Sequence, residues 1–195
     1  SFGEARVETQ PMPGGLRIEQ FDARSPTLTM RASGDWKLVD GSERSGLDIT
    51  LSSESLGKML ESLGYAGVID GGQTVARIKG NWAGSPAQFG LVNIDGELSG
   101  EVGEGRILNV DPGAGRIFGL VNFSAIPRRL SLDFRDFFQT GMAFDSIRGS
   151  FTLVDGSAHT ANLEIKGPAA DIRISGRTGL RAKDYEQDME VTPQL

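Results

Sequence analysis

Apolar and polar residues alternate with a period of two along most of the chain, the pattern of β-strands with one face toward a core and one in water. Strands that are apolar on one side only are typical of antiparallel sheets. The alternation therefore predicts a mostly β protein built on an antiparallel sheet. The clearest alternating apolar positions are Leu16 and Ile18; Leu28, Met30 and Ala32; Leu47, Ile49 and Leu51; Ala76 and Ile78; Leu130, Leu132 and Phe134; Phe151 and Leu153; Ala161, Leu163 and Ile165; Ile172 and Ile174.

Asp-Gly dipeptides separate several of these runs. The tetrapeptide Val-Asp-Gly-Ser occurs at residues 39–42 and again at 154–157. Asp-Gly between alternating runs is a strong hairpin signal, because both central residues of the turn tolerate positive φ. Each copy predicts a tight hairpin between two strands.

Two segments break the period of two and predict short helices. In residues 53–63, four apolar residues fall on one helical face, with Ser53 as the expected N-cap and Gly64 just past the end. These four residues are Leu56, Met59, Leu60 and Leu63. We expect both helices to lie against the apolar face of a curved, twisted sheet, shaped as an open groove or half-barrel.

The second predicted helix begins at Asp111-Pro112, which has the residue types of an N-cap followed by the first helical position. Ile117, Leu120 and Val121 then form a short apolar stripe. Three internal glycines lower the helical propensity of this segment.

A short pattern of apolar, Arg, apolar, polar and Gly residues occurs at 30–34, 76–80 and 172–176. It predicts a strand with a basic outer face and a glycine kink or bulge near its end. The copies fit either a structural repeat in an elongated sheet or a chance resemblance among short strands. We expect one domain over residues 1–195, with possible sub-repeats at about 1–110 and 111–195.

Composition narrows the functional classes. The 195 residues include 27 glycines and no cysteine and carry a net charge of −6, so disulfides are excluded and nucleic-acid binding is disfavoured. No run approaches the roughly 18 apolar residues that span a bilayer. The chain opens without Met or an apolar leader, and we expect it to be a piece of a longer protein.

No motif points to an enzyme, a metal or a cofactor. The one histidine, His159, follows a predicted turn, where a solvated side chain is the ordinary outcome. The glycines at 113–119 lack the dinucleotide-binding spacing. The acids Glu97, Glu101 and Glu104 fit a solvated face, whereas a glycan hydrolase would need two carboxylates facing each other in a cleft.

Arg128 and Arg129 directly precede the alternating strand 130–134, and Phe134, Phe137 and Phe138 follow closely. A basic, aromatic edge of this kind could meet anionic lipid headgroups or a partner protein. An ordinary strand entry beside a packed aromatic cluster fits the same residues equally well.

Several segments from about residue 47 onward resemble the C-terminal, AsmA-like region of YhdP-type proteins of Gram-negative bacteria. The densest are Asp-Pro-Gly-Ala-Gly-Arg-Ile-Phe-Gly-Leu at 111–120 and Ile-Pro-Arg-Arg-Leu-Ser-Leu-Asp-Phe at 126–134. Asn-Trp-Ala-Gly-Ser-Pro-Ala at 81–87 and Gly-Pro-Ala-Ala at 167–170 add to the likeness. The first 45 residues show only the general alternating pattern.

The resemblance implies a periplasmic segment of a protein that is anchored in the inner membrane through parts missing here. Such proteins are implicated in moving phospholipid toward the outer membrane along a trough with an apolar lining, and the family brings no catalytic residues. The implied partners are phospholipid acyl chains and envelope proteins, without nucleic acid. An alternative class is a periplasmic scaffold that aids outer-membrane assembly through exposed strand edges.

Strand parity selects the residues expected to line such a lipid groove. An open one-sided sheet supplies an apolar track without a specific site, and the same residues could instead close over a dry core. The candidate lining residues are Met30, Ile78, Leu132, Phe151, Leu153, Leu163, Ile165, Ile172 and Ile174, with Arg128 and Arg129 as rim or headgroup candidates.

Overall fold

A computed structural model describes residues 3–62, 67–108, 116–117, 121–122 and 141–194. Most of them form one antiparallel sheet of ten strands, in the order β1-β2-β3-β4-β6-β7-β12-β13-β14-β15. The mostly β, antiparallel fold predicted from the alternation is confirmed. The strands are β1 (Glu4–Met12), β2 (Gly15–Arg24), β3 (Thr29–Val39), β4 (Ser42–Ser53), β6 (Thr74–Ala83), β7 (Asp95–Val102), β12 (Ser146–Val154), β13 (Ser157–Lys166), β14 (Ala170–Gly179) and β15 (Asp184–Pro193).

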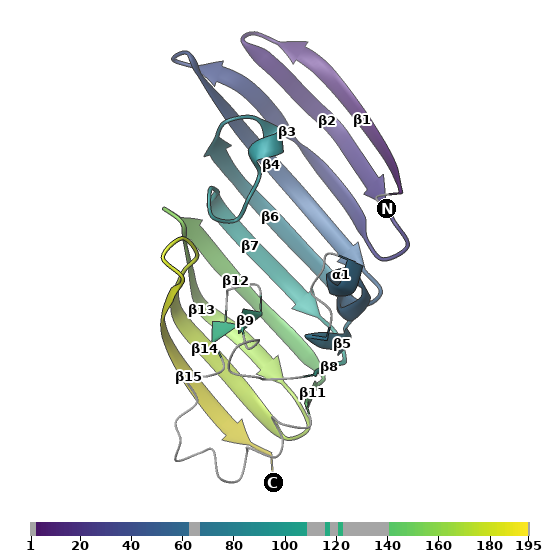
Figure 1. The fold of residues 1–195 in the computed structure, drawn as a ribbon, viewed down its shortest axis with the longest axis vertical. Helices are drawn as coiled ribbons and strands as arrows, with labels where there is room; N and C mark the ends of the chain where they lie inside the picture. The colour runs from purple at the N-terminus through teal and green to yellow at the C-terminus, as the bar shows by residue number, and fades with distance from the viewer. Residues whose placement is uncertain (1–2, 63–66, 109–115, 118–120, 123–140, 195) are drawn as a thin grey trace.

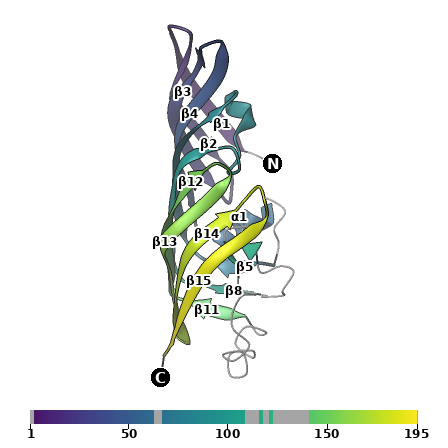
Figure 2. The same cartoon turned by 90° about the vertical axis from the view of Figure 1, so that its left-hand side faces the viewer.

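The strands β1 and β15 lie at opposite ends of this sheet, which is therefore open (Figure 1). Smaller elements are inserted between its strands: the helix α1 (Leu56–Ser62), the strands β5 (Ile69–Gly71), β8 (Gly105–Ile107) and β11 (Met142–Phe144), and the 3₁₀ turn η1 (Pro86–Gln88). The strands β11, β8 and β5 form a second, three-stranded antiparallel sheet. Figure 2 shows the twist and curvature of the large sheet, with α1 and the small sheet on one side of it.

Both Val-Asp-Gly-Ser segments form the predicted hairpins, joining β3 to β4 and β12 to β13. Asp40 and Gly41 have φ values of 51° and 77°, and Asp155 and Gly156 have 49° and 72°. Positive φ at both central residues is the signature of a type I′ turn, whose twist matches that of the flanking strands.

The first predicted helix is confirmed as α1, with Leu56, Met59 and Leu60 buried. Its N-cap is Ser55 and not Ser53: the Lys58 amide donates to the Ser55 hydroxyl at 3.3 Å. The Ser53 hydroxyl instead donates to the Thr27 carbonyl at 2.6 Å, which ties the end of β4 to the turn before β3. Leu63 and Gly64 lie outside the described residues.

The prediction of a second helix from Asp111 was wrong for the part that can be compared. Residues 111–115 and 118–120 lie outside the described residues, and the flanking pieces β9 (Arg116–Ile117) and β10 (Val121–Asn122) pair as antiparallel strands. Ile117 and Val121, expected on one helical face, are cross-strand partners. Glycines at 113, 115 and 119 explain the outcome, since each disfavours a helix by about 1 kcal/mol relative to alanine.

The three copies of the apolar, Arg, apolar, polar, Gly pattern lie on β3, β6 and β14. In two of them the glycine has positive φ, 156° at Gly34 and 122° at Gly176. Each of these two faces a partner strand at the point where the pairing register shifts, next to Ile18 in β2 and next to Thr160 in β13. The predicted bulge is therefore present at two copies; Gly80 in β6 pairs without a shift.

Candidate functional site

One face of the large sheet is apolar across its whole width. Its central row runs perpendicular to the strands and consists of successive cross-strand partners. Its residues lie on one face because side chains of the same parity in a strand point to the same side. Every position of the row is apolar. The row comprises Val7, Phe21, Ala32, Ile49, Ile78, Leu98 and Phe151, one residue from each of seven neighbouring strands.

The helix α1 and the three-stranded sheet pack onto part of this face (Figure 2). Leu60 of α1 is 1% exposed and Phe144 of β11 is 2% exposed, and both belong to one core cluster with Ile78 and Phe151 of the large sheet. This side of the molecule therefore contains a closed core beneath its covering elements.

A second covering segment runs between β6 and β7 through η1. The Trp82 indole donates to the Ser85 carbonyl at 3.0 Å and meets the Phe89 ring edge to face, with 5.6 Å between the ring centroids. Ile94 lies directly over Gly80, where an added Cβ would approach the Ile94 Cγ2 atom to 2.5 Å. Glycine at position 80 thus lets this segment sit close on the sheet.

Toward the N-terminal edge the same apolar face is open among the described residues. Val7 is 57% exposed on β1, and Leu38 is 59% exposed at the end of β3. Leu16, Ile18 and Trp36 are half-buried and lie outside the core cluster. A contiguous apolar surface of this kind marks an interaction site in a soluble domain.

Most of the candidate lining residues lie in the closed core and not on the open surface. Only Met30 is half-buried, at the boundary between the open and the covered parts. Leu132, Arg128 and Arg129 lie outside the described residues. Contact of any of these residues with lipid remains a prediction. The buried candidates are Ile78, Phe151, Leu153, Leu163, Ile165, Ile172 and Ile174, all between 0% and 8% exposed.

Sequence reasoning did not select Trp36, which belongs to the open apolar surface, or Phe21, which is half-buried and packs against the core cluster at the boundary of that surface. Leu16 and Ile18 had been recognised as an alternating pair, but they were not separated from the pairs of the later strands. Strand parity gives the face on which a side chain lies, whereas its exposure depends on elements inserted far away in the chain.

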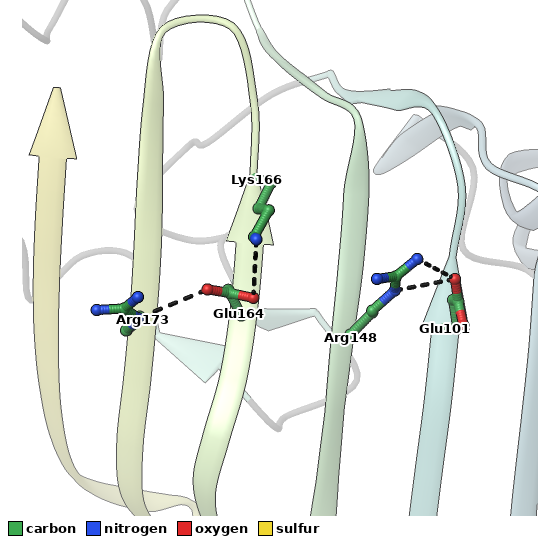
Figure 3. A network of polar contacts seen from close by, with 5 residues as sticks. All are labelled: Glu101, Arg148, Glu164, Lys166 and Arg173. Carbon is green, nitrogen blue, oxygen red and sulfur yellow. Dashed lines mark hydrogen bonds and ion pairs between the residues drawn. The ribbon is translucent and has the colours of Figure 1, made fainter. Parts of the chain in front are cut away.

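The opposite face of the sheet carries charged residues in matched cross-strand pairs (Figure 3). Arg148 donates through Nη2 to the Glu101 Oε1 atom at 2.6 Å. Glu164 lies 3.5 Å from the Arg173 Nε atom and 3.6 Å from the Lys166 Nζ atom. Because most of these groups are more than half exposed, each pair adds little stability, and their main effect is to keep this face in water. Across five strands the signs alternate along the row Glu101, Arg148, Glu164, Arg173 and Glu190.

Another ion pair on this polar face joins β4 and β6. The Arg77 guanidinium donates through Nε to Asp48 Oδ1 at 2.9 Å, and this hydrogen bond holds the pKa of the Asp48 carboxyl below its usual value. A hollow of about 870 Å³ opens here over β1 to β6, and its lining includes both positively charged arginines and negatively charged carboxylates.

The described residues contain no group of three or more side chains placed to hold a metal ion. His159 is exposed on the polar face, paired in the sheet with Thr152 and Arg177. Within the same part of the chain, no helix is long and apolar enough to cross a membrane.

Comparisons with known proteins show the family to which this chain belongs. The sequence profile of a family described as "YhdP protein" matches residues 1–195. The chain is also similar to the intermembrane phospholipid transporter YhdP of Escherichia coli (strain K12), with 29% identity over 167 residues. That alignment covers 85% of this chain but 13% of the transporter, so the chain spans a small part of that relative's length. No solved structure matches the chain. With a family profile that covers every residue, the chain belongs to the YhdP protein family.

Proposed function

We propose that this chain is a non-enzymatic segment of a periplasmic bridge, anchored in the inner membrane by other parts of the protein, that carries phospholipid toward the outer membrane. The observation that carries the proposal is the separation of the two faces, apolar on one side and charged on the other, across ten strands. A relative named as an intermembrane phospholipid transporter supports the same function.

A phospholipid that crosses an aqueous gap needs an apolar surface for its acyl chains. Each methylene of an acyl chain exposed to water costs about 0.8 kcal/mol, so a phospholipid crosses an aqueous gap only along apolar surface. A sheet with one apolar face provides that surface over its full width, and selectivity then comes from shape and rim charge. No side chain has to react with the lipid.

Within this chain, we place acyl-chain contact on the open surface of β1 to β3, around Leu16, Ile18 and Trp36, with Phe21 and Met30 at its boundary with the core cluster. These side chains are half-buried, whereas the candidate lining residues of β12 to β14 are covered. Lipid would reach the covered residues only if the parts of the chain packed over them moved away.

Site-specific photo-cross-linking in living Gram-negative cells tests this placement. A benzoylphenylalanine residue replaces Phe21 or Trp36 on the apolar face, and Asp22 or Lys37 on the polar face of the same strands. We expect phospholipid adducts, detected by mass spectrometry of the purified protein, at the first two positions only. Equal adducts on both faces, or none on either, would overturn the proposal.

The alternative function is a scaffold for outer-membrane assembly, for which the end strands β1 and β15 of the large sheet would provide edges. In the same experiment, a scaffold predicts cross-links to proteins without lipid adducts at Phe21 and Trp36.

A further inference from the structure

One row of cross-strand partners leads from the open apolar surface toward the covered part of the same face. Ile18 on β2 pairs with Gly34 on β3, and Gly34 pairs with Leu47 on β4. The next partner in the row is Gly80 on β6, the glycine that lies beneath Ile94. Because cross-strand partners share a face of the sheet, these residues define a continuous path across the strands.

Exposure along β4 distinguishes this row from the two rows beside it. Leu47 is half-buried and packs against the core cluster, whereas Ser45 and Ile49, its neighbours on the same face of the strand, are 1% and 6% exposed. Ser45 is covered by the segment between β6 and β7, and its hydroxyl donates to the Gly84 carbonyl at 2.8 Å. The open surface therefore reaches β4 at Leu47, between two covered positions.

Gly34 keeps the path free of side chains on β3. On the same face of this strand it is flanked by Ala32 and Trp36, which lie in the two neighbouring rows. The atoms nearest to a Cβ added at position 34 are backbone atoms of β4, at Gly46 and Leu47. A methylene chain laid across the strands here would contact the backbone at Gly34 and apolar side chains on both sides, which removes more of its surface from water than a flat position would.

Ile94 ends the path at β6. Its side chain is 1% exposed and fills the space above Gly80, since a Cβ added to that glycine would approach the Ile94 Cγ2 atom to 2.5 Å. Gly34 and Gly80 thus occupy equivalent positions in one row, two strands apart. At Gly80 the chain itself supplies the apolar group that packs on the glycine, and at Gly34 the described residues supply none from above the sheet.

We propose that a phospholipid acyl chain lies along this path, over Gly34 and Leu47, and that its methyl end stops against Ile94. Ile94 then limits the length of chain that the open surface accommodates, and it is a specificity-determining residue. The inference rests on the proposed function. It adds the direction of the acyl chain, across the strands, and a preference for chain length.

Titration of the 195-residue chain with single-chain phosphatidylglycerols tests the proposal. The probes carry a lauroyl, myristoyl, palmitoyl or stearoyl chain and are used below their micelle concentrations. Each buried methylene raises the affinity about fourfold, which corresponds to about 0.8 kcal/mol. We expect the affinity to rise with chain length by this factor until the methyl end reaches Ile94, and then to level off.

The variant Ile94→Ala removes part of the stop. We expect its affinity to level off at a longer chain, so that it binds the stearoyl probe at least about fourfold more tightly than the unmodified chain does, through one or more additional buried methylenes. Ile107→Ala is the matched control, because Ile107 is 3% exposed in the small sheet and loses the same atoms away from the path. It should leave the levelling length unchanged. Circular dichroism checks that each variant folds.

A second variant keeps the test decisive if Ile94→Ala does not fold. Leu47→Trp, at a half-buried position, places a ring in the path and should make the affinity level off at a shorter chain. An affinity that rises through stearoyl without levelling, or a levelling length that no folded variant at these two positions changes, would overturn the role of Ile94 and leave the proposed function standing. Failure of every probe to bind, together with no phospholipid cross-link at Trp36, would overturn the proposed function and this inference with it.

Discussion

Ile172 lies in the middle of β14 with 0% of its surface exposed, whereas Val7 on β1 is 57% exposed on the same face of the sheet. We expect Ile172→Ala to lower the free energy of unfolding by about 2–5 kcal/mol, because it removes buried methyl groups and leaves a cavity. Val7→Ala should change it by about 0.5 kcal/mol or less, as for most surface positions. Urea unfolding followed by circular dichroism measures both. A small loss at both positions would mean that Ile172 is not held in a packed core and would favour its role as a lipid contact.

These two residues also show how far the sequence could predict the site. Alternation placed Ile172 and Ile174 correctly on the apolar face, because side-chain direction in a strand follows from parity alone. Both belong to one core cluster with residues of α1, β5, β8 and β11, which come from positions as far apart as Leu56 and Phe144. No local pattern reports such a contact, and the open surface around Trp36 could not be distinguished from the covered surface around Phe151.

Among the elements, the hairpins were predictable because their signal is local. Asp-Gly determines the backbone conformation of two residues directly, and both copies adopt it. The segment from Asp111 contained conflicting signals, with a good helix start followed by three glycines. Its described residues form the short strand pair β9 and β10 and no helix. The helix α1 was predicted from its apolar stripe, but its N-cap lies two residues later than predicted. Ser53 and Ser55 are both serines, so residue type alone could not decide which of them caps the helix.

The first hairpin allows a test of backbone conformation without steric clash. Gly41 has φ 77°, and an added Cβ there would meet no atom within 4 Å. We expect Gly41→Ala to lower the free energy of unfolding by about 1–2 kcal/mol, through the cost of the left-handed conformation alone. Gly41→Asn should lose less, because asparagine tolerates this region. Thermal unfolding of the three proteins gives the comparison, and an equal loss in the two variants would contradict the conformational explanation.

At the scale of the whole molecule, the apolar face divides into two regions with different consequences. From Ala32 on β3 to Ile174 on β14, the covering elements and the sheet share one core cluster, which provides stability. Around Leu16, Ile18 and Trp36 on β2 and β3, the described face carries no residue of this cluster, and this is where we propose that an acyl chain binds. The charged face extends over both regions, so the sheet keeps one wet side along its full width.

Hydrogen–deuterium exchange with and without lipid distinguishes these regions. Without lipid, we expect amides of the central strands β6, β7 and β12 to β14 to exchange slowly, since their ladders lie beneath the packed core, and amides of β1 and β2 to exchange faster. A short-chain phosphatidylglycerol below its micelle concentration should slow exchange in β1 to β4 and leave β12 to β14 unchanged, because an acyl chain on the open surface excludes water from those strands alone. The same headgroup without acyl chains, glycerophosphoglycerol, is the matched control and should protect neither region. Faster exchange in α1 together with new protection of β13 and β14 would contradict the fixed cover: it would mean that lipid displaces α1 and the small sheet, and that the predicted lining residues of β12 to β14 are reached after all.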